Sequence, residues 1–287
     1  MSNRQLDLHC HSSASDGSDS PTQLVRRAAE VGLRALALTD HDTVSGLAEA
    51  EAEAARLGIE LVRGCEIAVR HDEDELHLLG LFLPAELPQP FLDALKKERN
   101  RRRERNAAML ERLRELGLEI SDDELHRAAG GEVVGRPHMA SVLLARQYVA
   151  TRSEAFERYL GRYGTAFVPR GLLSPAEGIA LLREAGALAV LAHPCLSAGM
   201  TPERLHVCLA ELADLGLDAV EAYHSTHNNA AVRLCLDCAA KYRLGVSGGS
   251  DYHGAAKAGI QLGRAGDGMV IPSTLLDALK ALHRNRA

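Results

Sequence analysis

The chain has 287 residues, of which 46% are hydrophobic and 25% are charged, and its net charge is −6 at pH 7. Aromatic residues make up only 3% and tryptophan is absent, which argues against a wall of stacked rings for single-stranded nucleic acid. The negative charge argues against a protein that coats nucleic acid by bulk electrostatics. The length allows one large barrel domain or two smaller domains around a sizeable core.

The six cysteines are spread through the chain and do not indicate a disulfide framework. Cys235 and Cys238 form a C-x-x-C pair within a helical pattern, and we interpret them as packed thiols rather than as zinc ligands. No apolar targeting stretch precedes the first strand pattern, and no segment is long and apolar enough to span a membrane. We therefore expect a cytoplasmic protein without a membrane association, and no obligate protein partner is indicated.

Short apolar runs alternate with longer amphipathic runs along most of the chain. Strands are expected at residues 5–11, 33–39, 59–69, 76–83, 188–192, 219–223 and 244–247. Helices are expected at residues 21–32, 45–57, 175–185, 202–215 and 229–242. Repeated units of a strand followed by a helix predict a parallel sheet, and this many units indicate a closed barrel.

The segment 91–163 breaks this alternation and reads as consecutive helices. We predict a helical insertion there, within a barrel domain formed by residues 1–90 and 164–287. Its first helix carries seven basic and two acidic residues, a local charge of +5: Lys96, Lys97, Arg99, Arg101, Arg102, Arg103 and Arg105 against Glu98 and Glu104. Such a run is usually a solvated helix face. The alternative is a lid that recruits phosphate groups, because its charge opposes that of the rest of the chain.

Histidines and acids lie where the predicted strands end. His9 and His11 are two apart on one strand, so their side chains point to the same face, and Asp251 and His253 repeat this spacing. The carboxyl ends of barrel strands converge on one mouth. Nine candidate metal ligands could meet there: His9, His11, Asp16, His41, Glu66, His77, His193, Asp251 and His253. One metal takes about four to six donors, so the set fits two or three ions that share a bridging carboxylate, although any one histidine alone could be an ordinary buried residue.

Four sequence blocks, with one dipeptide between them, resemble the PHP (polymerase and histidinol phosphatase) family of metallohydrolases. They are Asp7-Leu8-His9-Cys10-His11, Leu38-Thr39-Asp40-His41-Asp42, Gly64-Cys65-Glu66 and Ser250-Asp251-Tyr252-His253, with His193-Pro194 before the last. The resemblance implies an α/β fold, a distorted (β/α)7 barrel with a trinuclear metal site. The helical insertion would form a cap over the barrel mouth.

The resemblance also implies how the candidate ligands divide among three metals. By this resemblance, the first metal would be held by His9, His11, Glu66 and Asp251. Glu66 would bridge to a second metal held by His77 and His193, and the third would be held by Asp16, His41 and His253. Some relatives have histidine where this chain has Asp16, and the extra carboxylate favours Mn²⁺ or Fe²⁺ over Zn²⁺. We expect three Mn²⁺ ions.

The chain further resembles the branch that includes 3′,5′-nucleoside bisphosphate phosphatases and 5′-to-3′ exoribonucleases acting on short RNA. The resemblance lies in residues 11–17, in the arginine-rich start of the insertion and in Gly135-Arg136-Pro137-His138. It implies removal of the 3′-phosphate of nucleoside 3′,5′-bisphosphates, such as adenosine 3′,5′-bisphosphate, by metal-activated hydroxide. Short RNA would be a further substrate.

Residues outside the ligand set are candidates for catalysis and substrate binding. His224 follows a strand and could protonate the leaving 3′-oxygen, as could a metal-bound water; the alternative is a surface or supporting histidine. Arg136 and His138 are predicted to bind the scissile phosphate or the phosphate next to it. A second phosphate is assigned to Arg99, Arg102 and Arg170, since arginine can bind phosphate with two parallel hydrogen bonds. The alternative for Arg99, Arg102 and Arg136 is that they are plain surface residues.

Two other functions are consistent with parts of the sequence. One is a phosphatase for a small non-nucleotide substrate such as histidinol phosphate, although a substrate with one phosphate needs no second basic site. The other is a non-catalytic nucleotide- or RNA-binding module with a relict metal site. Residues able to bind metal fill all nine ligand positions, which opposes that alternative.

Overall fold

The fold is a seven-stranded sheet closed into a barrel, in a computed structural model that describes residues 5–131, 133–196 and 199–286. The strands are paired in sequence order: β1 (Gln5–Cys10), β2 (Leu33–Leu38), β3 (Glu60–His71), β4 (Asp74–Leu81), β5 (Leu188–Leu191), β6 (Ala219–Tyr223) and β7 (Gly245–Gly248). A parallel bridge between Cys10 and Tyr252 brings the end of β7 back to β1. The backbone hydrogen bond from Asp251 N to His9 O, at 2.9 Å, lies beside this bridge.

The prediction of a parallel sheet holds except at β4. This strand runs antiparallel to both of its neighbours, β3 and β5. Only Asp72 and Glu73 separate β3 from β4, and Asp72 has a φ of 50°. So short a connection makes a hairpin, because parallel neighbours need a crossover of about a dozen residues or more. The reversal puts His77, near the start of β4, at the same end of the barrel as Glu66.

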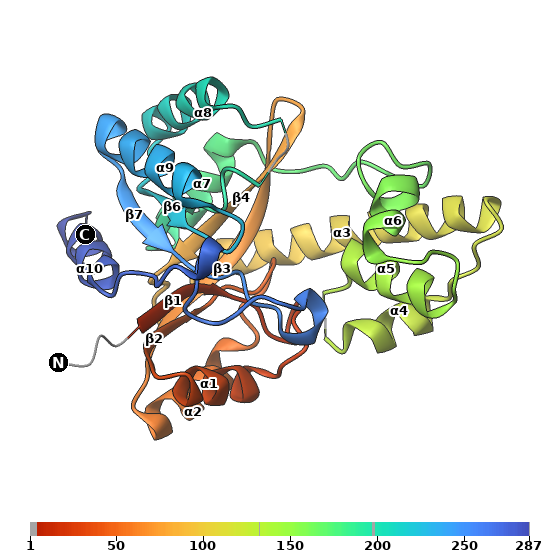
Figure 1. Cartoon of the computed structure of the whole chain (residues 1–287), viewed down its shortest axis with the longest axis horizontal. Coiled ribbons are helices and arrows are strands. Elements are labelled where there is room, and N and C mark those ends of the chain that lie inside the picture. The colour runs from red at the N-terminus through yellow and green to blue at the C-terminus, as the bar shows by residue number, and fades with distance from the viewer. Residues whose placement is uncertain (1–4, 132, 197–198, 287) are drawn as a thin grey trace.

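Helices surround the outside of the barrel, as Figure 1 shows. The helices outside the insertion are α1 (Pro21–Glu30), α2 (Leu47–Leu57), α7 (Pro175–Glu184), α8 (Pro202–Asp214), α9 (Asn229–Tyr242) and α10 (Thr274–Arg286). Ser20 and Ser174 begin α1 and α7 with capping boxes in which each serine side chain accepts a backbone N–H. The sequence patterns did not predict α10. None of the helices within the described ranges is long and apolar enough to cross a membrane.

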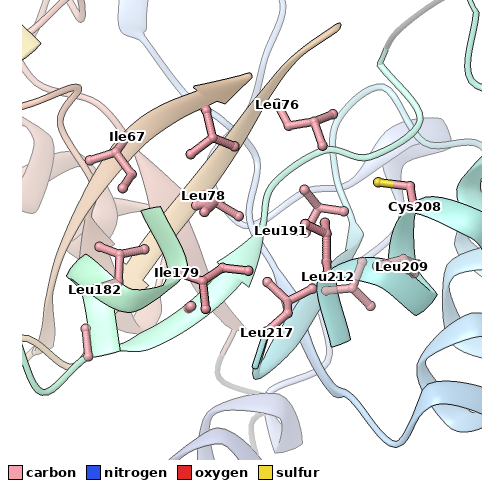
Figure 2. Packing of buried hydrophobic residues seen from close by; sticks show 14 of the residues in the cluster. Ile67, Leu76, Leu78, Ile179, Leu182, Leu191, Cys208, Leu209, Leu212 and Leu217 are labelled. Atoms are coloured by element: carbon pink, nitrogen blue, oxygen red, sulfur yellow. The ribbon is translucent and has the colours of Figure 1, made fainter. Parts of the chain in front are cut away.

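The largest buried cluster lies between the sheet and the helices that follow β4. Figure 2 shows Ile67 and Leu78 from β3 and β4 packed against Ile179 and Leu182 from α7, with Leu209 from α8 in the same cluster. Cys235 and Cys238 of α9 are fully buried in this cluster. Their position agrees with the interpretation of these residues as packed thiols.

The segment between β4 and α7 is helical, as predicted. It contains α3 (Gln89–Glu115), α4 (Asp122–Ala129), α5 (Arg136–Ala145), α6 (Arg152–Ala155) and a π-helical turn at Phe156–Leu160. These helices have their own core, which includes Met109 and Leu143, whereas Phe91 and Leu95 at the start of α3 pack into the barrel core. The long helix α3, yellow in Figure 1, therefore joins the two cores. The domain boundaries at residues 91 and 163 stay a prediction.

Candidate metal centre and arginine cluster

Glu66 lies at the centre of the candidate metal site and is 1% exposed. Its Oε2 lies within 3.4 Å of ring nitrogens from three histidines: His9 at 3.4 Å, His11 at 3.1 Å and His41 at 3.1 Å. Its Oε1 faces two others: His77 at 2.7 Å and His193 at 3.2 Å. Because each carboxylate oxygen faces a separate set of imidazoles, Glu66 could serve as a ligand to two metal ions at once.

Two aspartates complete the group on either side of His253. Asp16 Oδ1 lies 3.2 Å from Nε2 of His253, and Asp16 Oδ2 lies 3.7 Å from Nε2 of His41. Asp251 Oδ1 lies 3.3 Å from Nδ1 of His253 and 3.5 Å from Nε2 of His11. The structure thus brings together all nine residues that the sequence analysis selected, from segments spread over almost the whole chain.

Unusual backbone geometry accompanies the site. His193 and Asp251, which follow β5 and β7, have φ values of 29° and 57°, in a region that non-glycine residues seldom adopt. Gly249 lies so close to β1 that a Cβ there would come within 2.2 Å of the Cβ of His9. Only glycine therefore fits at position 249.

The donor set fits divalent metal ions. The Nε2 atoms of His9 and His11 are 3.1 Å apart, and two protonated nitrogens at that distance would repel each other. Burial alone would lower the pKa of His253, but Asp16 and Asp251 raise it to about 9. The ammonium group of Lys257 pairs with Asp251. The site therefore attracts positive charge, and its imidazole nitrogens and carboxylate oxygens are ligands for Mn²⁺, Fe²⁺ and Zn²⁺.

Glu221 supports this site, and the sequence analysis missed it. Its Oε1 lies 3.0 Å from Nδ1 of His9, and its Oε2 accepts a hydrogen bond of 2.8 Å from the backbone N of His193. A carboxylate behind a metal-binding histidine fixes the orientation of the ring and its tautomer. A single acid within the apolar strand Ala219–Tyr223 was the available signal.

His224 lies beneath the candidate ligands and is fully buried. Its Nδ1 is 2.9 Å from Oγ1 of Thr226, and its Nε2 is 3.4 Å from Oδ2 of Asp251. The cavity over the site has a volume of about 320 Å³, and its lining includes Lys257 but not His224. The role of His224 as a proton donor stays a prediction. Lys257 also lines this cavity, and the sequence analysis did not select it.

Three of the predicted phosphate-binding arginines converge on Asp42. Arg102 donates from Nε and Nη2 to Oδ2 of Asp42, at 3.0 and 2.6 Å, and Arg170 donates from Nη1 at 3.0 Å. Arg99 donates to the backbone oxygen of Asp42 at 2.7 Å. Burial alone would raise the pKa of Asp42, but Arg102 and Arg170 lower it to about 2.

Two further arginines extend this group. Arg105, which the sequence analysis did not assign, is 7% exposed. Burial, together with repulsion from Arg102, Arg136 and Arg170, lowers its pKa to about 8. Arg136 lies 3.6 Å from Glu75 and 5.8 Å from the ring centre of Phe167. We call the following four residues the arginine cluster: Arg102, Arg105, Arg136 and Arg170. Carboxylates close to this cluster include Asp42, Glu75 and the buried Glu98, which also pairs with Arg101.

His138 is buried near both Asp16 and Arg102, and burial lowers its pKa. It is 4% exposed, and its Nδ1 accepts a hydrogen bond of 3.0 Å from the backbone N of Gly135 at the start of α5. Together with Asp16 it lines a second, larger cavity. The structure therefore places His138 in one cavity wall with Asp16, a predicted ligand of the third metal.

Buried histidines and carboxylates at the mouth of the barrel, with a cluster of buried arginines beside them, define a metal-dependent phosphoesterase. Comparison with known families agrees with this class: residues 7–172 match the family described as PHP domain. The chain belongs to the PHP family.

Relatives of known name support the same chemistry. The chain is 35% identical over 251 residues to a 5′-3′ exoribonuclease of Haemophilus influenzae, covering 87% of this chain and 90% of the relative. It is 34% identical over 267 residues to a 3′,5′-nucleoside bisphosphate phosphatase of Chromobacterium violaceum, covering 91% and 92%. The structure of an amidohydrolase from Chromobacterium violaceum, with bound sulfate and no metal, is similar with a TM-score of 0.85 and 30% identity, covering 97% of this chain and 96% of that one.

Proposed function

We propose that the protein removes the 3′-phosphate of nucleoside 3′,5′-bisphosphates, for example converting adenosine 3′,5′-bisphosphate to AMP. The observation that carries this proposal is the arginine cluster beside the metal site. A substrate with two phosphates offers one phosphate to the metal site and one to the arginine cluster. Histidinol phosphate has a single phosphate, so it would leave the arginine cluster without an anion. The relative in Chromobacterium violaceum with this activity supports the same substrate class.

Arg170 is the strongest part of this argument. It is 7% exposed, and its Nη2 has no hydrogen-bond partner among the residues that the structure describes. A buried donor without an acceptor costs about 1–3 kcal/mol, and more when it is charged. A phosphate oxygen would satisfy this donor, and arginine can bind phosphate through two parallel hydrogen bonds.

The residues of the chain would then divide the work of hydrolysis. Glu66 and the surrounding histidines would hold divalent metals, and Glu221 keeps His9 oriented. When bound, such metals would make water nucleophilic near neutral pH and offset charge on the phosphoryl oxygens. The arginine cluster binds the 5′-phosphate and orients the scissile group. Phe156 and Leu196 line the cavity over the site, and their apolar side chains would contact the nucleoside and exclude water.

We propose Mn²⁺ as the native metal, bound as three ions by the nine predicted ligands. The three carboxylates Asp16, Glu66 and Asp251 make the site harder than a site of histidines alone, which favours Mn²⁺ or Fe²⁺ over Zn²⁺. The partner is a small nucleotide, with short RNA as a further candidate.

A comparison of substrates tests the proposal. With Mn²⁺-loaded protein, we expect kcat/KM for adenosine 3′,5′-bisphosphate to exceed that for AMP and for histidinol phosphate by at least about tenfold, as loss of one charged contact would predict. Arg170→Ala should lower kcat/KM for the bisphosphate by about 10- to 100-fold and change the rate on one-phosphate substrates little. Arg183→Ala, which removes an exposed arginine of α7, is the matched control.

Other outcomes would overturn the proposal. Equal rates on histidinol phosphate, together with no effect of Arg170→Ala, would indicate a phosphatase for small non-nucleotide substrates. Tight nucleotide binding by the metal-free chain without turnover in any metal would indicate a binding module. If Arg170→Ala does not fold, Arg136→Ala tests the same cluster from a half-buried position.

A further inference from the structure

Two cysteine thiols are in contact near the candidate metal site. Sγ of Cys195 lies 3.8 Å from Sγ of Cys235. Cys195 follows β5 and is half-buried, whereas Cys235 belongs to α9 and is fully buried. Both are free thiols, and within the described ranges this is the recorded contact between two cysteine sulfur atoms. A disulfide bond is shorter than this contact, so the two sulfur atoms must approach each other for a bond to form.

The C-x-x-C spacing does not identify this pair. Sequence spacing alone would pair Cys235 with Cys238, one turn later on the same helix. In the structure, Sγ of Cys238 instead lies 3.4 Å from Nδ1 of His206. The thiol in contact with Cys235 comes from a segment 40 residues earlier in the chain. The structure therefore links α9 to the segment that follows β5.

That segment also carries a predicted metal ligand, His193. The backbone N of His193 donates to Oε2 of Glu221 at 2.8 Å, and the backbone N of Cys195 donates to Nε2 of His227 at 3.4 Å. Pro194 lies between them, and its ring fixes its φ angle. The φ of 29° at His193 persists only while the surrounding contacts hold it. A displacement of Cys195 is therefore transmitted to His193 through one stiff residue.

The other side of the thiol pair is held more firmly. Cys235 lies in the largest buried cluster, together with Leu209 and Leu212 of α8, which Figure 2 labels. The side chain of Asn228 caps the first turn of α9. Shifting a close-packed helix disturbs many contacts at once, whereas Cys195 lies on a connecting segment. Formation of the bond should therefore draw Cys195 toward α9.

We propose that Cys195 and Cys235 form a reversible disulfide that displaces His193 and weakens metal binding. The oxidant is a peroxide. The sulfur of Cys195, the more accessible of the two, bonds to one peroxide oxygen, the O–O bond breaks, and a sulfenic acid and one water form. The sulfur of Cys235 then bonds to the sulfenic sulfur, and the S–O bond breaks to release a second water. Two thiols are oxidised, the peroxide is reduced to water, and the thiol protons end in the water molecules.

A small dithiol reverses the step by thiol–disulfide exchange. The inference goes beyond the proposed reaction, and it rests on that proposal only through His193 as a metal ligand. Metal binding and hydrolysis by the reduced protein test the proposed function without the disulfide. The effect of oxidation on metal binding tests the disulfide.

Treatment of the chelator-treated protein with hydrogen peroxide tests the inference. After the peroxide is removed, the intact mass should be lower by two hydrogen atoms, and peptide mapping should recover Cys195 linked to Cys235. The affinity for Mn²⁺, measured by competition with a chelator of known affinity, should fall by at least about tenfold, as for other disturbances around a metal ligand. Dithiothreitol should restore both the mass and the affinity.

Single variants assign the effect to this pair. Cys195→Ser, at a half-buried position, should bind Mn²⁺ like the reduced wild type and should neither form the disulfide nor lose affinity after peroxide. Cys235→Ala removes the same bond from the helix and serves if Cys195→Ser does not fold. Cys238→Ala leaves the pair intact and is the matched control, so it should respond to peroxide like the wild type.

Three results would overturn the inference. The first is peroxide-treated protein without the linked peptide. The second is a disulfide that forms and leaves the affinity for Mn²⁺ unchanged. The third is a Cys195→Ser protein that loses affinity after peroxide as the wild type does. Each of these leaves the proposed phosphatase function standing if the reduced wild type binds Mn²⁺ and hydrolyses the bisphosphate.

Discussion

Nδ1 of His9 lies 3.0 Å from Oε1 of Glu221, and both side chains are fully buried. The second oxygen of Glu221 accepts a hydrogen bond from the backbone N of His193. One carboxylate of β6 therefore positions two candidate metal ligands, His9 within β1 and His193 after β5. The metal site depends on a residue that does not itself face the substrate cavity.

Glu221→Gln should weaken Mn²⁺ binding by about 10- to 100-fold, because loss of an outer carboxylate releases the orientation of a ligating histidine. Competition with a chelator of known affinity measures the change. Glu211→Gln, which removes an exposed glutamate paired with His71, should bind Mn²⁺ like the wild type. An unchanged affinity in Glu221→Gln would mean that His9 is held without Glu221.

Metal binding should release protons and tighten as the pH rises toward about 9. Burial alone would lower the pKa of His77, but Glu66 and Glu75 raise it to about 10. The pKa of His253 is raised to about 9. Both rings are therefore protonated at pH 7 in the metal-free protein and must lose those protons to bind a metal, so the affinity falls as the pH falls. Calorimetry in two buffers of different ionisation enthalpy counts the protons released, and a count of zero would contradict this account.

The metal site was more predictable from the sequence than the arginine cluster. Most candidate ligands lie at or just after the end of a predicted strand, in a local pattern such as the alternation of His9 and His11. Closure of the barrel then brings the strand ends together. The direction of β4 could have been inferred from the short connection at Asp72 and Glu73, which leaves no room for a helix.

The contacts of α3 could not be read from periodicity. Arg105 belongs to the basic run that the sequence analysis selected, but Arg136 and Arg170 approach it from later segments. Which face of α3 turns toward the barrel depends on packing at both ends, with Leu95 in one core and Met109 in another. A single helix pattern does not contain that information.

Asp42→Asn should destabilise the metal-free protein and make its stability depend on phosphate. The buried carboxylate is paired with Arg102 and Arg170, and breaking a buried ion pair costs about 3–5 kcal/mol. Inorganic phosphate can replace the lost charge, so it should raise the Tm of this variant more than that of the wild type. Thermal unfolding of chelator-treated protein with and without phosphate measures both effects.

The control for this experiment is Asp277→Asn, which removes an exposed partner of Arg34. It should leave both the Tm and the phosphate shift unchanged. If phosphate stabilises Asp42→Asn and the wild type equally, the arginine cluster is not a phosphate site.

Gly249→Ala should lower both the free energy of unfolding and the affinity for Mn²⁺. The added Cβ would come within 2.2 Å of the Cβ of His9 and 2.5 Å of its backbone N, so β1 must move. Overpacking of this kind costs about 1–3 kcal/mol. Gly171→Ala is the control, because no atom lies within 4 Å of a Cβ at that position. If urea unfolding gives the two variants the same free energy of unfolding, β1 can shift to accommodate the added Cβ without loss of stability.

The product formed from adenosine 3′,5′-bisphosphate by the Mn²⁺-loaded protein tests the central claim most directly. Chromatography of the nucleotide and an assay of released phosphate should give 5′-AMP and inorganic phosphate in equal amounts, with neither formed by chelator-treated protein. Release of the 5′-phosphate to give 3′-AMP would contradict the proposed placement of the two phosphates. Turnover of histidinol phosphate without turnover of the bisphosphate would contradict the proposed substrate class.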